Sequence, residues 1–300
     1  MAIPGLLAAA PIVLLAGAFG WVAIARRRFE TQLTALVSAL RASQHAPLAA
    51  PELPAIVRDY AVRAGGRLGA SGLFHARQTA LLTTMEGTAP IALAAEQWTG
   101  IVSPGLVWRA DGRMRGLPVS VFDALVEGRG ELSARLLWSI PVAGGRGADY
   151  DRAEMMRFLS ELPVYPDAIL NNGAVRWRQL DARTVEAAAS SAGGAASVRF
   201  TFDEAGDIVA MTADDRPRTI AGGASVPTGW RGTYSRYTGF GPYRLPAYGE
   251  VGWDLPGGFF TYWRGTLVGY GRSMDPARIE MAQYTGVAMR VGRSTDQPGD

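Results

Sequence analysis

The segment that most constrains the fold lies in the middle of the chain, at residues 149–177. It holds the strongest helix pattern within a long run of strand-like sequence. Met155, Phe158, Leu159 and Leu162 recur at the i, i+3, i+4 and i+7 spacing of one helical face. A single amphipathic helix cannot bury such a face alone. We therefore expect the flanking strands to form a sheet that packs on this helix.

The sequence also predicts where this helix begins and ends. Asp151 and Glu154 have the spacing of a capping box, which predicts a start at Asp151. Pro163 and Pro166 cannot continue a helix. The predicted helix therefore covers residues 151–162.

Composition excludes several classes of function. All 30 basic residues are arginine, and the chain contains no cysteine. Disulfides, thiolate nucleophiles, Walker A lysines and Schiff-base lysines are therefore excluded. His45 and His75 are the two histidines, and no G-x-S-x-G, H-E-x-x-H or EF-hand pattern occurs. We predict no catalytic residue, no metal site and no cofactor.

The N-terminal region predicts a membrane anchor. Residues 3–25 are uncharged and span about 23 positions, where a bilayer requires about 20. Arg26, Arg27 and Arg28 follow, but no arginine precedes the run, so the basic start of a cleavable signal peptide is missing. We expect residues 1–28 to be an uncleaved transmembrane helix in the inner membrane. The positive-inside rule places the body in the cytoplasm, with a periplasmic body as the open alternative.

Residues 29–66 are predicted to be a helical linker region. Phe29, Leu33 and Leu40 continue at helical spacing, and residues 45–54 contain three prolines. A second short helix is expected to begin at Pro54 and to end at Gly65-Gly66.

From Leu73 the apolar period changes to two, which indicates a β-rich globular domain over residues 67–290. About a dozen strand-like segments follow, separated by turn residues, and this pattern favours antiparallel hairpins over βαβ units. We read the glycines of residues 144–147 and the pair Asp214-Asp215 as turns. Residues 291–300 lack an apolar period and are expected to be a disordered tail.

These patterns together predict a mainly β (α+β) fold. A large curved antiparallel sheet or half-barrel packs on the central helix and follows the N-terminal transmembrane helix.

Five segments, taken as an ordered set, resemble an uncharacterised bacterial family, one of the domains of unknown function. They are FHARQTALLTTM from Phe74, PGLVWRAD from Pro104, RFLSELPVYPDAIL from Arg157, VRW from Val175 and YRLPAYGEVGW from Tyr243. The resemblance implies no activity. The strand pattern is also similar to the curved half-barrel of the LolA/LppX lipoprotein carriers, which implies a similar architecture.

Glu161 is the most informative charged residue of the central segment. It follows Arg157 by four positions, which is typical of a surface ion pair along a helix. Alternatively, Glu161 is buried and pairs with an arginine of the sheet, such as Arg218 or Arg244. We favour the surface pair, because glutamate is rarely buried without a partner.

The preferred function is a membrane-anchored, non-catalytic binding protein for a lipid or another apolar ligand. A carboxylate-dependent hydrolase and an anchored scaffold for a partner protein remain alternatives. Nucleic acid is not expected, because the net charge is only +3 and no basic cluster follows Arg26–Arg28. The candidate ligand-binding residues lie on the central helix and on the aromatic strands: Phe158, Glu161, Trp177, Phe200, Phe202, Arg218, Arg244 and Trp253.

Overall fold

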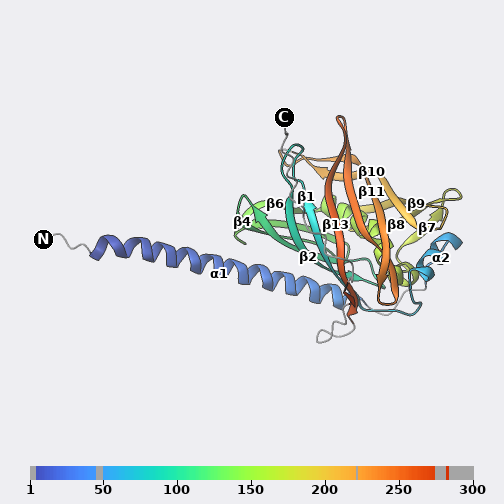
Figure 1. Cartoon of the computed structure of the whole chain (residues 1–300), viewed down its shortest axis with the longest axis horizontal. Helices are drawn as coiled ribbons and strands as arrows, with labels where there is room; N and C mark the ends of the chain where they lie inside the picture. The colour runs from blue at the N-terminus through green and yellow to red at the C-terminus, as the bar shows by residue number, and fades with distance from the viewer. Residues whose placement is uncertain (1–4, 45–49, 221, 274–281, 284–300) are drawn as a thin grey trace, which may run out of the picture.

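The computed structural model describes residues 5–44, 50–220, 222–273 and 282–283 (Figure 1). Four α-helices and one short 3-10 helix lie in these ranges. They are α1 (Gly5–Ala42), α2 (Ala55–Arg63), α3 (Ala148–Ser160), the 3-10 helix η1 (Leu162–Val164) and α4 (Pro166–Asn171). The expected tail at 291–300 and part of the proline-containing linker, residues 45–49, lie outside the described residues.

Within the described residues, fourteen strands form one antiparallel sheet. The strands are β1 (Leu73–Leu82), β2 (Ile91–Gly100), β3 (Leu106–Met114), β4 (Leu117–Val126), β5 (Arg129–Leu136), β6 (Ile140–Arg146), β7 (Arg176–Gln179), β8 (Thr184–Ser191), β9 (Gly194–Phe202), β10 (Ile208–Thr219), β11 (Ser225–Phe240), β12 (Tyr243–Leu255), β13 (Gly258–Ser273) and β14 (Ala282–Gln283). Their order is β6-β5-β4-β3-β2-β1-β13-β12-β11-β10-β9-β8-β7, and β14 pairs with β13.

The pairing of β1 with β13 joins two meanders into this single sheet, with Ala76 opposite Tyr270. Each meander consists of consecutive hairpins. The sheet curls around the central helix, as Figure 1 shows, and forms a half-barrel. The predicted mainly β fold with a curved antiparallel sheet is therefore confirmed.

Helix α3 packs on the concave face of the sheet. Met155, Phe158, Leu159 and Leu162 are all buried, at 1% exposure or less, as their spacing predicts. The helix begins three residues earlier than expected, after Gly147, and no side chain caps it. The capping-box interpretation was therefore wrong.

Asp151 lies inside the first turns of α3 and has a different role from the predicted cap. Its Oδ1 accepts a hydrogen bond from the backbone N–H of Gly130 at 2.6 Å. The carboxylate thus ties the helix to the neighbouring β4–β5 hairpin.

Two segments expected to be turns are strands instead. Gly144 and Gly145 lie within β6. Asp214 and Asp215 lie within β10, where the register shifts between Ala213 and Arg216. The exposed Asp214 and Asp215 sit in this β-bulge, which turns the next side chain, Arg216, toward the concave face.

Helix α1 packs on the convex face of the sheet. Phe29, Leu33 and Leu40 form a small apolar cluster with Val107 and Phe122 of β3 and β4. The carboxylate of Glu30 accepts two hydrogen bonds from Arg109, at 2.9 and 2.8 Å.

The N-terminal part of α1 projects away from the body (Figure 1). Phe19, Trp21 and Ile24 on this part are 74%, 66% and 55% exposed. Among the described residues, no helix is both long and apolar enough to cross a bilayer. The predicted transmembrane helix is therefore not confirmed.

Candidate functional site

A cavity of about 720 Å³ lies between the concave face of the sheet and helix α3. Both meanders contribute to its wall, because the inward-facing positions of β1–β6 and β10–β13 surround it. Successive side chains of a strand point to opposite faces of the sheet, and most of those that point into the cavity are apolar. The apolar lining includes Leu82, Ile91, Leu93, Val119, Val121 and Leu132.

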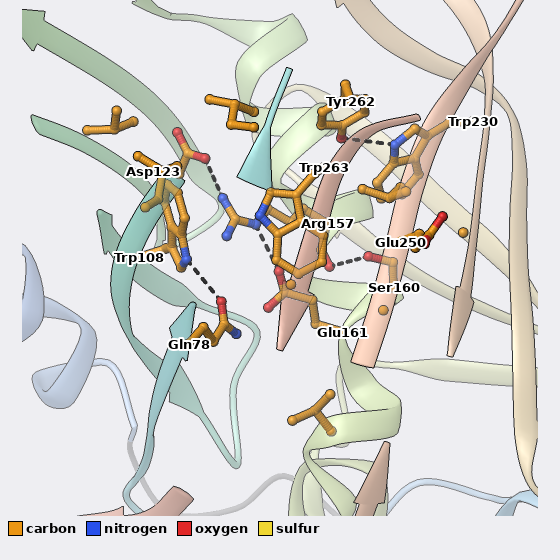
Figure 2. A pocket seen from close by; sticks show the side chains of 18 of the residues that line it. Gln78, Trp108, Asp123, Arg157, Ser160, Glu161, Trp230, Glu250, Tyr262 and Trp263 are labelled. Atoms are coloured by element: carbon orange, nitrogen blue, oxygen red, sulfur yellow. Dashed lines mark hydrogen bonds and ion pairs between the residues drawn. The ribbon is translucent and has the colours of Figure 1, made fainter. Parts of the chain in front are cut away.

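One end of the cavity, which we call the floor, holds a charged cluster formed by Asp123, Glu154, Arg157, Glu161 and Arg216. Arg157 of α3 is the centre of this cluster (Figure 2). Its guanidinium donates a hydrogen bond to Asp123 of β4 and another to Oε1 of Glu161 at 2.9 Å. Glu154, one turn earlier on the helix, lies 3.9 Å from Nη1 of Arg157. The guanidinium also lies over the ring of Trp108, 4.9 Å from its centroid.

Glu161 extends this cluster to the sheet through Gln97. The amide of Gln97 donates to Oε2 of Glu161, lies 3.0 Å from the hydroxyl of Tyr165 and lies 3.0 Å from the hydroxyl of Thr99. These contacts fix the orientation of the Glu161 carboxylate at the end of α3.

A second guanidinium, that of Arg216, reaches the floor from β10. It stacks over Trp230 at 4.3 Å and Trp253 at 5.3 Å from the ring centroids. Its Nη2 lies 3.8 Å from Oε1 of Glu154. The indole N–H of Trp230 donates to the hydroxyl of Tyr262 at 3.1 Å, which holds the stacked ring in place.

The buried carboxylates of the floor have raised pKa values. Burial, with the nearby charge of Asp123, raises the pKa of Glu154 to about 8. Burial also raises the pKa of Asp123, and Arg157 opposes that shift. Burial therefore favours the protonated form of Glu154.

Comparison with family models decides the family of this chain. Residues 43–265, about three quarters of the sequence, match the model described as a family of unknown function, DUF6544. The chain belongs to the DUF6544 family. The match contains all five segments that carried the resemblance, which is thereby confirmed. A comparison with curated proteins finds no match.

Comparison with solved structures finds similar architectures at low sequence identity. A domain described as an outer membrane lipoprotein-sorting protein domain from Vibrio parahaemolyticus has 10% identity and a TM-score of 0.44, and the match covers 73% of this chain and 91% of that one. A LolA superfamily protein from Nitrosomonas europaea has 8% identity and a TM-score of 0.41, over 74% and 95% of the two chains. A DUF1329 family protein from Desulfovibrio piger has 9% identity and a TM-score of 0.39, over 77% and 93%. These matches assign no function.

Two of the eight candidate residues from the sequence, Glu161 and Trp253, line the cavity. Glu161 pairs with Arg157, as the i,i+4 spacing predicted, but the pair lies in the partly buried floor. Arg218 lies at the edge of the floor, with its guanidinium 6.0 Å from the centroid of Trp253. Arg244 lies elsewhere and forms a two-point ion pair with Asp207 at 2.7 Å.

The remaining four candidates are not among the residues that line the cavity. Phe158, Phe200 and Phe202 are fully buried in the core. Trp177 is half-buried and stacks on Phe200, with ring centroids 6.1 Å apart. The structure thus places these side chains in the core beside the cavity.

Asp123, Glu154 and Arg216 belong to the site but are not among the residues predicted from the sequence. Asp123 had a detectable signal, because it occupies an inward position between Val121 and Leu125 in an alternating strand. Glu154 was assigned to a capping box that does not form. Arg216 faces inward only because of the bulge in β10, which the alternation pattern does not reveal.

Among the described residues, no group of three or more histidine, aspartate or glutamate side chains is placed to hold a metal ion. The floor offers carboxyl and guanidinium groups in a mostly apolar surrounding.

Proposed function

We propose that this protein binds a lipid or another apolar molecule in the cavity between its sheet and α3, without converting it chemically. The observation that carries the proposal is the cavity itself. Its volume of about 720 Å³ lies within the range of about 300–1,000 Å³ typical of small-molecule sites. Its wall is mostly apolar, and most of its charged groups lie on the floor, with Glu250 of β12 as a further charged lining residue. This arrangement fits a ligand with a long apolar part.

The proposal is tested with diphenylhexatriene, a neutral apolar dye that fluoresces when it is shielded from water. Ala134→Phe places a bulky ring into the cavity, while Ala92→Phe adds the same ring at an exposed position on a strand of the same sheet. We expect Ala134→Phe to lose dye binding and Ala92→Phe to keep it. Equal binding by both variants would contradict the proposal. Native mass spectrometry of gently extracted protein would identify the bound lipid.

We further propose that α1 holds the cavity at a membrane. Residues 3–25 carry no charge, and the exposed Phe19, Trp21 and Ile24 lie on the projecting part of the helix. The guanidinium of Arg26 lies over Trp138, 5.2 Å from its ring centroid, in the β5–β6 hairpin. The helix therefore leaves the body beside β6, which contributes Val142 to the cavity lining.

Membrane attachment is tested by fractionating cells that express the full chain or a chain without residues 1–24. We expect the full chain in the membrane pellet and the truncated chain in the supernatant. Protease added to spheroplasts determines on which side of the membrane the body lies. The arginines after residue 25 predict a cytoplasmic body, which would stay protected from the protease. Recovery of the full chain in the supernatant would contradict the attachment.

A carboxylate-dependent hydrolase is the second candidate, and one observation favours it. Glu154 has a pKa raised to about 8, and such an acid is protonated at neutral pH and can protonate a leaving group. This function requires turnover of an ester or glycoside. Turnover that Glu154→Gln or Glu161→Gln abolishes, in a folded protein, would replace the binding function by a hydrolytic one.

A further inference from the structure

Two buried carboxylate oxygens on the cavity floor lack a hydrogen-bond partner. They are Oδ1 of Asp123 and Oε2 of Glu154. Both residues line the cavity, and they are only 9% and 3% exposed. Buried polar atoms in native proteins are nearly always hydrogen-bonded. These two oxygens are therefore placed to accept hydrogen bonds from a bound molecule.

The charges of the floor are unbalanced by one. Within the ion-paired cluster of the floor, three carboxylates, those of Asp123, Glu154 and Glu161, face two guanidinium groups, those of Arg157 and Arg216. Arg218 at the edge of the floor and the Glu250–Arg264 pair lie outside this cluster. With all five groups ionised, the cluster carries a net charge of −1. Burial raises the pKa of Glu154 to about 8, and a proton on this carboxyl group balances the charge near neutral pH. A cation from the ligand would balance it equally well.

We propose that the ligand is an amphiphilic amine, whose primary ammonium group donates hydrogen bonds to Asp123 and Glu154 while its apolar chain lies along the cavity wall. This inference rests on the proposed binding function. An ammonium group supplies the donors that the two oxygens lack and the positive charge that the floor lacks. A carboxylate ligand would instead bring a further negative charge beside Asp123 and Glu161.

The guanidinium groups already have partners of their own. Arg157 donates to Asp123 and Glu161. The guanidinium of Arg216 contacts the indole rings of Trp230 and Trp253 and lies 3.4 Å from the backbone oxygen of Ala153. Neither guanidinium group is therefore left unpaired and available to bind an anionic ligand. The floor atoms without a hydrogen-bond partner are carboxyl oxygens, and both can accept a hydrogen bond once Glu154 is ionised.

The proposal includes a proton balance. Near neutral pH the Glu154 carboxyl carries a proton, and the incoming ammonium keeps all three of its own protons. The carboxyl releases its proton to the solvent and becomes the carboxylate that pairs with the ammonium. Asp123 from β4, Arg216 from β10, Arg157 from α3 and Glu161, which directly follows α3, are the charged groups that face Glu154. Binding therefore releases close to one proton at pH 7.

The test compares three ligands with the same chain length: dodecylamine, 1-dodecanol and dodecanoate. Isothermal titration calorimetry of the full chain in amphipol, in two buffers that differ in ionisation enthalpy, gives affinity and proton release together. Binding by Ala134→Phe is subtracted, so that only binding in the cavity counts. We expect the amine to bind at least tenfold more tightly than the alcohol and to release close to one proton, while the alcohol releases none.

Glu154→Gln removes the charge and keeps the shape of the side chain. It should weaken amine binding at least tenfold, abolish proton release and leave alcohol binding within twofold. The matched control is Glu186→Gln, which makes the same change on β8, where Glu186 pairs with Arg178 outside the cavity. This control should behave as the unmodified protein does.

The outcomes separate this inference from the proposed function. Equal binding of amine and alcohol without proton release would overturn the ammonium site and leave the apolar cavity standing. Tightest binding of dodecanoate would overturn it as well and would assign the head group to Arg216. If Ala134→Phe weakens the binding of none of the three ligands, both the ammonium site and the apolar binding function are overturned. The wild-type ligand series and proton count decide the matter even if Glu154→Gln fails to fold.

Discussion

Arg157 of α3 donates a hydrogen bond to Asp123 of β4, and this ion pair joins the central helix to the concave face of the sheet. The side chains of the two residues are 15% and 13% exposed. Asp123 comes from the first meander, while Glu154, beside Arg157 on the helix, faces Arg216 of the second meander. The floor cluster therefore connects both meanders through one helix.

Arg157→Met should destabilise the fold by about 3–5 kcal/mol at pH 7, because it leaves the carboxylates of Asp123 and Glu161 without their cation. Urea denaturation measures this loss. The control is Arg178→Met, which breaks an exposed pair with Glu186 and should cost less than about 1 kcal/mol. Equal losses in the two variants would show that the Arg157 cluster contributes no more than a surface pair.

Leu159→Ala should cost about 2–5 kcal/mol, because Leu159 is fully buried between α3 and the sheet. Leu117→Ala, at a position that is 46% exposed, should cost less than about 1 kcal/mol. Thermal or chemical denaturation compares the two variants. A loss under half a kcal/mol at Leu159 would contradict the role of α3 as the centre of the core.

The sequence was sufficient to predict the curved sheet and the helix that it packs on, because both follow from apolar periodicity. The period of two that begins at Leu73 marks strand faces, and the spacing of Met155, Phe158 and Leu159 marks one helical face. These patterns show which side chains are buried, and the burial of apolar side chains is the main driving force of folding. The pairing of β1 with β13 was beyond prediction, because the two strands are far apart in the sequence.

The site was predicted only in part. Arg216 reaches the floor through a bulge, which has no periodic signal. Glu154 lies four positions before Phe158 and shares its helical face, but the predicted capping box gave it another role. Phe200 and Phe202 were chosen for their aromatic character, and the structure uses them to fill the core.

Removing residues 1–24 should leave the stability of the body almost unchanged, within about 1 kcal/mol. Phe19, Trp21 and Ile24 are exposed and do not contribute to either apolar cluster. Removal of residues 1–43 should destabilise it by several kcal/mol, on the order of 25 cal/mol for each Å² of apolar surface exposed at Val107 and Phe122. Urea denaturation of the two truncated chains provides the comparison. Equal stability would show that α1 does not pack on the convex face.

The raised pKa of Glu154 predicts that the free energy of unfolding of the protein, measured without added ligand, falls as the pH rises. Its pKa is about 8 in the folded state, against an ordinary value of 4.5. Between these values the folded state binds a proton that the unfolded state does not, so the free energy of unfolding decreases with rising pH across this window. Above about pH 8 this contribution to the free energy of unfolding is lost completely. The loss is on the order of a few kcal/mol.

Glu154→Gln isolates this effect, because its amide does not titrate. Urea denaturation at pH 5, 6.5, 8 and 9 should show the variant gaining stability relative to the unmodified protein as the pH rises, with a constant difference above about pH 8. Glu186→Gln should show no such trend, because Glu186 lies in an ion pair with Arg178 outside the cavity. If the difference between the Glu154→Gln and unmodified proteins is the same at all four pH values, Glu154 is ionised in the folded protein. In that case no proton balances the charge of the floor.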